Sequence, residues 1–403
     1  MNSNLIFKNT VLFFALGVFS CGKSAQTSNL SQQQLPTTQQ TINPIKTGAQ
    51  NLVNNLNLLQ NKKVGIITNQ TGIIDNQTHL VDLLVEKKIN VTKIYAPEHG
   101  FHGTADAGEL IKDGKDTKTN LPIISLYGNN KKPNPEQLAN IDVMLFDLQD
   151  VGARFYTYIS SLHYVMEACA EQNIPVIVLD RPNPNGSIID GPILEMENTS
   201  FVGMHPIPVL HGMTIGEYAQ MINGERWLKN GIQVNLKVIK IENYNHNMPY
   251  SLPVKPSPNL PNDQAINLYA SLCFFEGTNV SVGRGTEKQF QIYGSPFITN
   301  LPFEFTPKPN FGAKDPMHNG KKCYGEDLTN APKVTQLELK YLIAAYQNTT
   351  DKTKFFNSFF TKLAGTKKLQ KQIEMEMTED EIRASWEVGI NQFQKIRAKY
   401  LLY

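Results

Sequence analysis

The segment from Glu98 to Gly103 places a carboxylate and two imidazoles in one short loop. Pro97 restricts the backbone before the loop, and the two glycines within it allow turns that other residues resist. A carboxylate presented in this way can act as a general acid or base, and Glu with His99 and His102 can also hold a metal ion. A polar turn with a capping Glu is the structural alternative.

Two further acids, Asp106 and Glu109, follow on the same long loop. Glycoside hydrolysis uses a pair of carboxyl groups, one to protonate the leaving oxygen and one to act as base or nucleophile. The loop therefore indicates hydrolysis of a glycosidic bond. A metal site is the weaker interpretation, because no partner cluster with metal-ligand spacing occurs elsewhere in the sequence.

A second polar cluster runs from Phe146 to Tyr158, where two acids, an arginine and two tyrosines follow a strongly apolar stretch. An arginine fork binds carboxylates through two parallel bonds, and tyrosine rings can stack on a sugar. Asp150, Arg154 and Tyr156 are therefore candidate substrate contacts. A salt-bridged loop with core aromatics is an equally good explanation of any one of them.

The third cluster, Asp180 to Gly186, contains two prolines and a glycine, which predicts a rigid polar loop. Asp180, Arg181 and Asn183 can bind sugar hydroxyl or acetamido groups. For Asn185 a structural turn is as good an interpretation.

The fourth cluster, Glu276 to Thr286, is rich in glycine but lacks the Lys-Ser/Thr ending of a phosphate-binding loop, so nucleotide binding is rejected. Glu276 and Arg284 are expected to face a cleft between two domains, with Arg284 available for an anionic group. The sequence has no GxSxG elbow for a serine hydrolase and no GxGxxG after the first strand for a nicotinamide cofactor. No cofactor and no metal is expected, and the net charge of +2 gives no indication of a nucleic-acid partner.

Short apolar runs alternate with helical patterns between residues 51 and 245. The expected strands are 64–69, 90–96, 121–127, 142–148, 174–179 and 234–241. This alternation predicts an α/β fold with a Rossmann-like, mainly parallel sheet covered on both faces. Ligands bind at the carboxyl ends of such strands, and five of the runs end in polar side chains. These ends are Asn69-Gln70, Glu98-His99, Tyr127, Asp147 to Asp150, and Asp180 to Asn183.

A change of composition follows the last of these runs. Five prolines lie between residues 245 and 261 and mark a linker or an ordered loop. Residues 246–403 are predicted to form a second, smaller mixed α+β domain. Helices are expected at 267–276, 337–347, 350–363 and 379–398.

The first 21 residues resemble a lipoprotein signal peptide. Lys8 precedes the apolar run Val11 to Phe19, and Ser20-Cys21-Gly22 follows it. Cleavage before Cys21 and lipidation of its thiol would anchor the protein in the cell envelope, with the polar residues 22–50 as a flexible tether. An ordinary signal peptide with an incidental Cys21 is the alternative.

The motifs also carry a family resemblance from about Leu52 to the end of the chain. The sequence resembles the exo-β-N-acetylmuramidase family, long catalogued as a domain of unknown function. The segments that carry the resemblance are Gly65 to Gly72, Tyr95 to Glu109, Asp147 to Tyr158, Asp180 to Gly186, Gly191-Pro192, Pro208 to Thr214, Pro256 to Pro261 and Glu276 to Thr286.

The resemblance implies a Rossmann-like domain and a smaller domain with the active site between them. It implies removal of N-acetylmuramic acid from the non-reducing ends of peptidoglycan fragments, with Glu98 as the leading catalytic residue. Glu109 is favoured as the second carboxylate over Asp106, Asp147 and Asp150. The remaining candidates are assigned to substrate binding, with an arginine selecting the lactyl carboxylate: Asn69, His99, His102, Asp150, Arg154, Tyr156, Asp180, Arg181, Asn183, Glu276 and Arg284.

Two other functions stay open on the sequence. A non-catalytic peptidoglycan-binding lipoprotein would use the same cleft without turnover. A metal-dependent amidase or deacetylase would use His99 and His102 as ligands. The separation of the two carboxyl groups, which decides between retention and inversion, is not encoded in the sequence pattern.

Overall fold

The computed structural model describes residues 43–403, except 76, 107–108 and 110–111. Residues Pro44–Tyr403 form one compact unit. The predicted signal peptide, Cys21 and most of the predicted tether lie outside the described residues. Helix α1 (Gly48–Val53) begins within the range predicted as tether, so the last residues of that range belong to the folded unit. Within the described ranges, no helix is long and apolar enough to cross a membrane.

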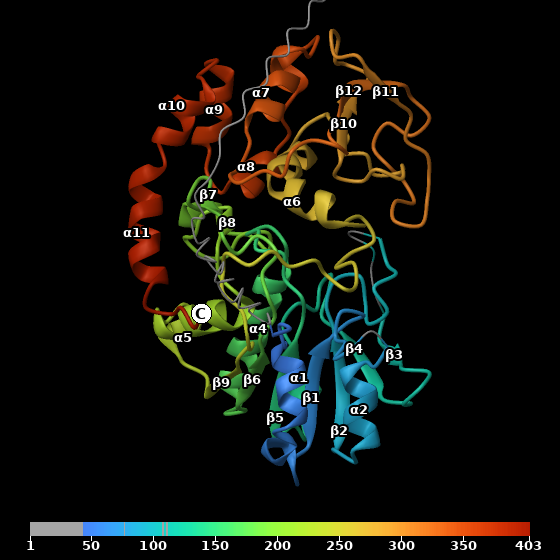
Figure 1. Cartoon of the computed structure of the whole chain (residues 1–403), viewed down its shortest axis with the longest axis vertical. Coiled ribbons are helices and arrows are strands. Elements are labelled where there is room, and N and C mark those ends of the chain that lie inside the picture. Colours follow the sequence, from blue (N-terminus) through green and yellow to red (C-terminus); the bar gives the residue numbers. More distant parts are fainter. Residues whose placement is uncertain (1–42, 76, 107–108, 110–111) are drawn as a thin grey trace, which may run out of the picture. The chain divides into compact units, whose positions relative to one another are not determined.

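A seven-stranded sheet in the order β3-β4-β2-β1-β5-β6-β9 forms the centre of the first half (Figure 1). Every neighbouring pair is parallel except β3 and β4, which confirms the predicted Rossmann-like α/β architecture. The strands are β1 (Val64–Thr68), β2 (Val91–Ala96), β3 (Gly114–Lys115), β4 (Pro122–Ser125), β5 (Val143–Asp147), β6 (Val176–Leu179) and β9 (Leu236–Ile239). The order reverses on either side of β1, so β1 and β5 flank the topological switch point.

Alternating side chains along the strands supply two separate cores. In β5, Val143 and Leu145 pack with α1 and α2 (Leu80–Glu86) on one face. Met144 and Phe146 pack on the other face with α4 (Tyr158–Glu171) and α5 (Ile215–Gly224). Because successive side chains of a strand point to opposite faces, apolar residues at every position predict a sheet buried on both sides.

The second half contains a smaller antiparallel sheet in the order β10-β12-β11, in agreement with the mixed α+β structure predicted for it. Its strands are β10 (Ile292–Ser295), β11 (Phe303–Phe305) and β12 (Cys323–Asp327). In the first half, a separate two-stranded ladder joins β7 (Ile189–Asp190) to β8 (Leu210–His211). The remaining α-helices are α3 (Pro135–Leu138), α6 (Asp263–Leu272), α7 (Lys340–Gln347), α8 (Phe359–Ala364), α9 (Lys368–Glu374), α10 (Glu379–Ala384) and α11 (Glu387–Arg397). Short 3-10 helices are Leu56–Leu59, Met196–Asn198, Lys229–Gly231, Cys273–Gly277 and Lys352–Lys354.

Two predicted helices differ from the structure for local reasons. The helix expected at 350–363 is confined to α8, because Asn357 accepts a hydrogen bond from the Phe359 backbone N–H and forms a turn just before it. The helix expected at 379–398 is two helices, α10 and α11. At the break, the Ser385 hydroxyl donates to the Ile382 carbonyl at 2.6 Å and competes with the helical bonding pattern.

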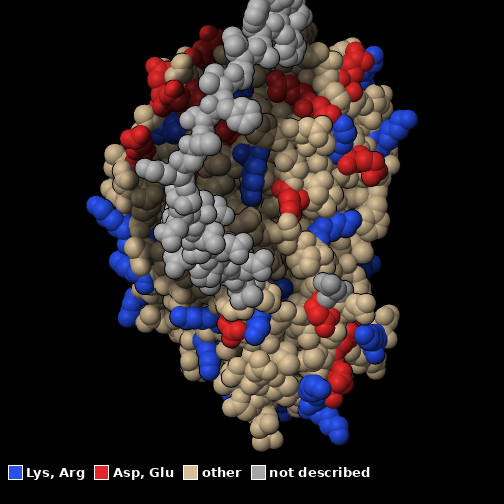
Figure 2. Space-filling view, viewed as in Figure 1, with Lys and Arg blue, Asp and Glu red and all other residues tan. Residues whose placement is uncertain are grey.

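Figure 2 shows acidic and basic side chains interspersed over the face in view.

Candidate active site

A cavity of about 370 Å³ opens where the carboxyl ends of β2, β4 and β5 meet the second half of the chain. Glu98 and His99 follow β2, Tyr127 follows β4, and Phe155 to Tyr158 follow β5. The opposite wall comes from later segments of the chain. The remaining lining residues are Lys131, Phe201, Val202, Ser257, Leu260, Tyr269, Glu276, Arg284, Phe290 and Phe359.

Glu98 is held in this cavity through both of its carboxyl oxygens. The Tyr127 hydroxyl donates to Oε1 at 2.8 Å, and the Thr157 hydroxyl donates to Oε2 at 2.9 Å. Thr157 is the N-cap of α4, but its side chain makes no capping bond and is directed to Glu98 instead. The half-buried carboxyl group is therefore fixed in orientation by side chains that follow two other strands, Tyr127 after β4 and Thr157 after β5.

The loop after β2 has the backbone geometry that its glycines predict. His99, Gly100 and Gly103 all have positive φ, and a Cβ at Gly103 would collide with the Gln70 side chain. His99 is 7% exposed, and its Nδ1 lies 2.8 Å from the Ala105 carbonyl. Burial lowers the pKa of His99 even though Glu98 and the Ala105 carbonyl act in the opposite direction, which favours the neutral ring. This contact orients His99 at the edge of the cavity beside Glu98.

Glu276 and Arg284 form an ion pair on the opposite wall. Nε and Nη2 of Arg284 both donate to Oε1 of Glu276, at 2.8 and 2.6 Å. The guanidinium lies 5.2 Å from the centre of the buried Phe290 ring. Burial by itself disfavours the cation, but Glu276 raises the pKa of Arg284 on balance. Nη1 is shielded from solvent and has no hydrogen-bond partner within the described residues.

Tyr156 and Tyr158 line the cavity, and Asn69 lies outside the lining and bonds to Tyr158. The Tyr156 hydroxyl donates to the Pro256 carbonyl at 3.0 Å, and the Asn69 amide donates to the Tyr158 hydroxyl at 2.7 Å. Gln70 also donates to the Pro256 carbonyl. The proline-rich loop is therefore an ordered part of the cavity wall, and the fully buried Asn69 acts through Tyr158 instead of reaching the cavity itself.

Arg154 lies away from the cavity lining, fully buried, although it was predicted to contact substrate. Its guanidinium donates to four backbone carbonyls, those of Pro192, Ile207, Leu363 and Ala364, at 2.7–2.9 Å. The last two belong to the C-terminal turn of α8, where a cation is favoured by the helix dipole. The structure thus uses Arg154 to join the two halves of the chain.

Arg181 and Asp150 are likewise engaged within the fold. Nε of Arg181 donates to Asp147 at 2.7 Å, and Arg181 is only 3% exposed. Asp150 accepts from the Gly152 backbone N–H at 2.6 Å and lies 3.8 Å from Nε2 of His211. Burial raises the pKa of Asp150 to about 7. Neither side chain is part of the cavity lining, in contrast to the substrate contact expected from the sequence.

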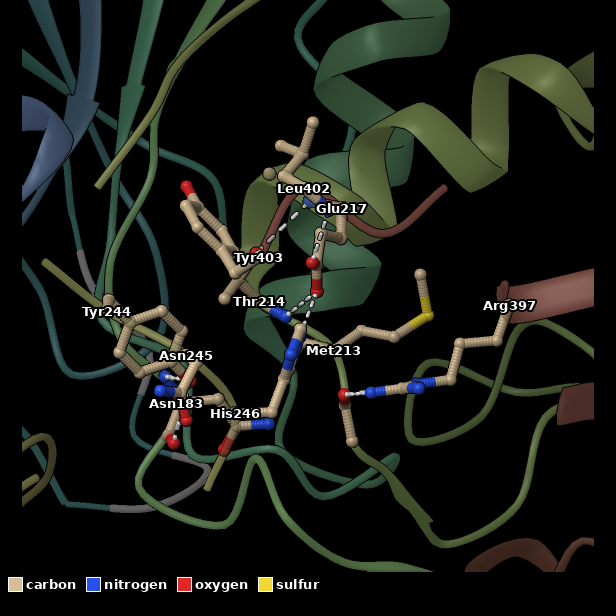
Figure 3. A network of polar contacts seen from close by, with 12 residues as sticks. Asn183, Met213, Thr214, Glu217, Tyr244, Asn245, His246, Arg397, Leu402 and Tyr403 are labelled. Atoms are coloured by element: carbon tan, nitrogen blue, oxygen red, sulfur yellow. Dashed lines mark hydrogen bonds and ion pairs between the residues drawn. The ribbon is translucent and has the colours of Figure 1, made fainter. Parts of the chain in front are cut away.

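Asp180 lies under the C-terminal tail of the chain, and Asn183 is bonded to a neighbouring loop. Asp180 is fully buried and accepts the Tyr403 hydroxyl at 2.6 Å, and Asn183 donates to the Met213 carbonyl at 2.9 Å. Figure 3 shows the adjoining Glu217, which accepts the Leu402 backbone N–H at 2.8 Å and contacts Nε2 of His246 at the same distance. Asp180 therefore anchors the tail together with Glu217, and neither Asp180 nor Asn183 is part of the cavity lining where they were predicted.

The two remaining predicted residues lie on the loop after Glu98. His102 is exposed and packs edge-on against Phe101. Glu109 forms an ion pair with Lys314 at 2.6 Å, and that contact is the main reason why the pKa of Glu109 is lowered. Glu109 is not part of the cavity lining, so the geometry brings Glu276, and not Glu109, together with Glu98.

Several residues that line the cavity were not assigned to the site from the sequence. Thr157 lies within a recognised motif, and Tyr127 was named as one of the five polar strand ends but was not assigned to substrate or catalysis. Lys131 and Phe201 had none, because they belong to loops without a motif. Among the described residues, no group of three or more His, Cys, Asp or Glu side chains is arranged to hold a metal ion.

A cavity with two carboxylates and aromatic walls, at the carboxyl edge of a doubly wound sheet, fits the glycoside hydrolase class. The chain belongs to the exo-β-N-acetylmuramidase NamZ family, as the sequence analysis predicted. The N-terminal family model matches residues 64–264, and the C-terminal model matches residues 267–403.

Individual relatives agree with this assignment. The peptidoglycan β-N-acetylmuramidase NamZ of Bacillus subtilis (strain 168) is 40% identical over 367 residues, which cover 86% of this chain and 88% of the relative. Two crystal structures of DUF1343 family proteins from Bacteroides fragilis NCTC 9343 are also similar. One has a TM-score of 0.83 at 44% identity and covers 90% of this chain and 99% of its own. The other has a TM-score of 0.76 at 30% identity and covers 89% and 99%.

Proposed function

We propose that this protein is an exo-acting β-N-acetylmuramidase that removes terminal N-acetylmuramic acid from the non-reducing ends of peptidoglycan fragments, with Glu98 as the general acid. The observation that carries the proposal is the fixed carboxyl group of Glu98, held by Tyr127 and Thr157 inside a cavity with aromatic walls. The printed activity of the Bacillus subtilis relative supports the choice of substrate.

In this mechanism Glu98 gives a proton to the glycosidic oxygen as the bond between that oxygen and the sugar C1 breaks. Water supplies the hydroxyl group that ends on C1, and the proton that the water releases restores the acid form of Glu98 for the next turnover. Glu276 is the second acidic side chain in the described part of the cavity lining, and it takes the role that the sequence analysis gave to Glu109. Its ion pair with Arg284 holds the Glu276 side chain in position, where as a carboxylate it would stabilise the positive charge that develops on the sugar ring.

Of the three candidate arginines, Arg284 is the one that we propose binds the lactyl carboxylate of muramic acid. Arg154 and Arg181 are occupied by backbone carbonyls and by Asp147, whereas Arg284 lines the cavity. Nη1 has no hydrogen-bond partner among the described residues, since Glu276 uses only Nε and Nη2, but it is closed to solvent, so the lactyl carboxylate reaches it only when the Arg284 side chain shifts. A charge-assisted bond from this nitrogen would favour muramic acid over glucosamine, which lacks the lactyl group.

The test uses the purified full chain with chromogenic β-N-acetylmuramide and β-N-acetylglucosaminide. We expect release from the muramide, and a loss of about 100-fold or more in kcat for Glu98→Gln, in line with the usual contribution of a general acid. Glu109→Gln is the matched control, because it removes an acid from the same loop outside the cavity lining. Full activity of Glu98→Gln would contradict the mechanism.

Two other outcomes would identify a different function or specificity. Cleavage of the glucosaminide alone would overturn the muramic acid specificity. Binding of peptidoglycan fragments without product after long incubation would favour the non-catalytic binding protein. For Arg284→Met we expect the preference for muramide over glucosaminide, measured as the ratio of kcat/KM, to fall about 10-fold, as the loss of one charge-assisted contact predicts.

We further propose that the protein is attached to the cell envelope through lipid on Cys21. The support is the order of Lys8, the apolar run and Ser20-Cys21-Gly22 in the sequence. Expression of the full chain in a bacterial host with a clickable fatty acid should label the wild type, whereas Cys21→Ala should remain unlabelled. Equal labelling of the two proteins would refute the anchor.

A further inference from the structure

The mouth of the cavity carries a cationic group that the proposed mechanism does not use. Lys131 lines the cavity, and its ammonium group lies 4.5 Å from the centre of the Phe201 ring. Within the described residues Lys131 has no carboxylate partner, unlike its neighbour Lys132, which pairs with Glu167 at 2.7 Å and Glu171 at 2.8 Å. The ammonium group of Lys131 is therefore held in place without being neutralised.

Two anchored loops place this group. Lys132 fixes the loop after β4 to α4, and Tyr127, which bonds to Glu98, begins the same loop. Phe201 lies at the tip of a tight turn closed by reciprocal backbone bonds between Ser200 and Gly203, at 2.9 and 3.0 Å. Apolar side chains are unusual at such a tip, where Gly, Asn and Asp predominate. Phe201 also stacks on Tyr164 of α4, with the ring planes 18° apart.

The position of Lys131 relative to Arg284 suggests its role. Arg284 is itself half-buried, but its Nη1 is shielded from solvent and its guanidinium packs on Phe290, which is 1% exposed, so we place it at the closed end of the cavity. Lys131 and Phe201 are half-buried and mark the open end. An exo-acting enzyme takes the terminal sugar into the closed end, so the rest of the saccharide leaves through the mouth. Lys131 thus lies on the side of the leaving group.

We propose that Lys131 is a specificity-determining residue that binds a carboxylate on the leaving saccharide, with Phe201 as the residue that positions its ammonium group. The inference rests on the proposed muramidase function. It predicts a preference for fragments in which the leaving group itself contains a muramic acid with its carboxylate. A disaccharide, whose leaving sugar is neutral N-acetylglucosamine, would not benefit from Lys131.

The experiment compares two substrates with the purified full chain. One is the disaccharide of muramic acid on N-acetylglucosamine, and the other is the tetrasaccharide, whose leaving trisaccharide carries one carboxylate. For Lys131→Met we expect kcat/KM on the tetrasaccharide to fall about 2- to 5-fold, the usual effect of one partly exposed charge pair, with little change on the disaccharide. Lys131→Arg should retain the preference, and Lys131→Glu should lower it further.

The controls separate this role from a general effect on the fold or on net charge. Lys362→Met removes an equally charged, exposed lysine outside the cavity lining and should leave the ratio of kcat/KM for the two substrates unchanged. In the wild type the ratio should decline as salt rises, and in Lys131→Met it should not, because salt screens exposed charges. Phe201→Leu should weaken the salt dependence of the ratio, a change that a merely structural role would not produce.

The outcomes also separate the two proposals. If the wild type hydrolyses neither saccharide, the muramidase function and this inference both fail. If it hydrolyses both and Lys131→Met lowers kcat/KM equally on the two substrates, or on neither, the function stands and the role of Lys131 is overturned.

Discussion

The C-terminal tyrosine offers a sharp test of how the polar strand ends are used. The Tyr403 hydroxyl donates to the fully buried Asp180 at 2.6 Å and accepts the Ile241 backbone N–H at 2.8 Å. Above pH 7, where Asp180 is ionised, Tyr403→Phe removes a hydrogen bond to a charged group, which contributes about 1.5–3 kcal/mol to the free energy of unfolding. It also leaves the Ile241 N–H without a partner, which adds to the destabilisation.

Tyr400 is a matched control in the same tail. Its hydroxyl donates to Glu225, also at 2.6 Å, but the Glu225 side chain is 23% exposed. Water can replace the lost donor there, so Tyr400→Phe should lower the free energy of unfolding by about 1 kcal/mol or less. Urea and thermal unfolding of the two variants and the wild type measure the difference. Equal destabilisation by the two variants would refute the argument that burial at Asp180 sets the magnitude.

The pH dependence of the same variant follows from the ionisation of Asp180. Burial raises the pKa of Asp180 to about 7, despite the hydroxyl and amide donors around it. The folded state therefore binds a proton that the unfolded chain, with a pKa of about 3.9, releases, so this group's contribution to stability is lost as pH rises from about 4 to 7. Above that range the Tyr403 bond is made to a carboxylate and is strongest. Tyr403→Phe should thus be more destabilising at pH 8.5 than at pH 5.5, and the opposite order would contradict the assignment.

Three further predictions concern the cavity and its support. Thr157→Val should lower kcat about 10-fold with little change in melting temperature, because it removes a bond that orients Glu98; an unchanged kcat would contradict this. Glu109→Gln should alter kcat less than about 2-fold, since its partner is the exposed Lys314; a larger loss would return Glu109 to the catalytic machinery. Arg154→Met should destabilise the fold by roughly 4 kcal/mol or more, measured by urea unfolding, because four carbonyls lose their donor; a mild effect would refute the joining role of Arg154.

The architecture could be predicted from the sequence because its determinants are local. Apolar runs such as 143–147 are uninterrupted, so they indicate strands buried on both faces, and all six predicted strands are present in the sheet. The two helices that differ, near Asn357 and Ser385, depend on single side-chain bonds to the backbone. Such side-chain bonds interrupt a helix but leave the spacing of apolar residues in the sequence unchanged. That spacing alone therefore predicts a longer helix than the structure contains.

The candidate site could be predicted only in part, because a polar side chain at a strand end can either line the cavity or bond within the fold. Glu98 and Arg284 reach the cavity, whereas Arg181 and Asp180 turn inward and bond within the fold. Sequence gives the side chain at a strand end but not the segment that covers it. Lys131 and Phe201 were missed for a related reason, since their contact joins loops 70 residues apart that carry no motif.

The segments that cover the strand ends explain why the cavity is displaced from the topological switch point. Open doubly wound sheets leave the crevice between their two central strands free for a ligand, here between β1 and β5. In this chain Asn69 and Asp147 at that crevice are fully buried. Asn69 bonds to Tyr158, which contacts the proline-rich loop at Pro256, and Asp147 pairs with Arg181. The tail closes the neighbouring end of β6 through Tyr403. The open ends that remain are those of β2 and β4 and the turn after β5, where Glu98, Tyr127 and Thr157 meet, so the covering segments decide which strand ends can hold a sugar.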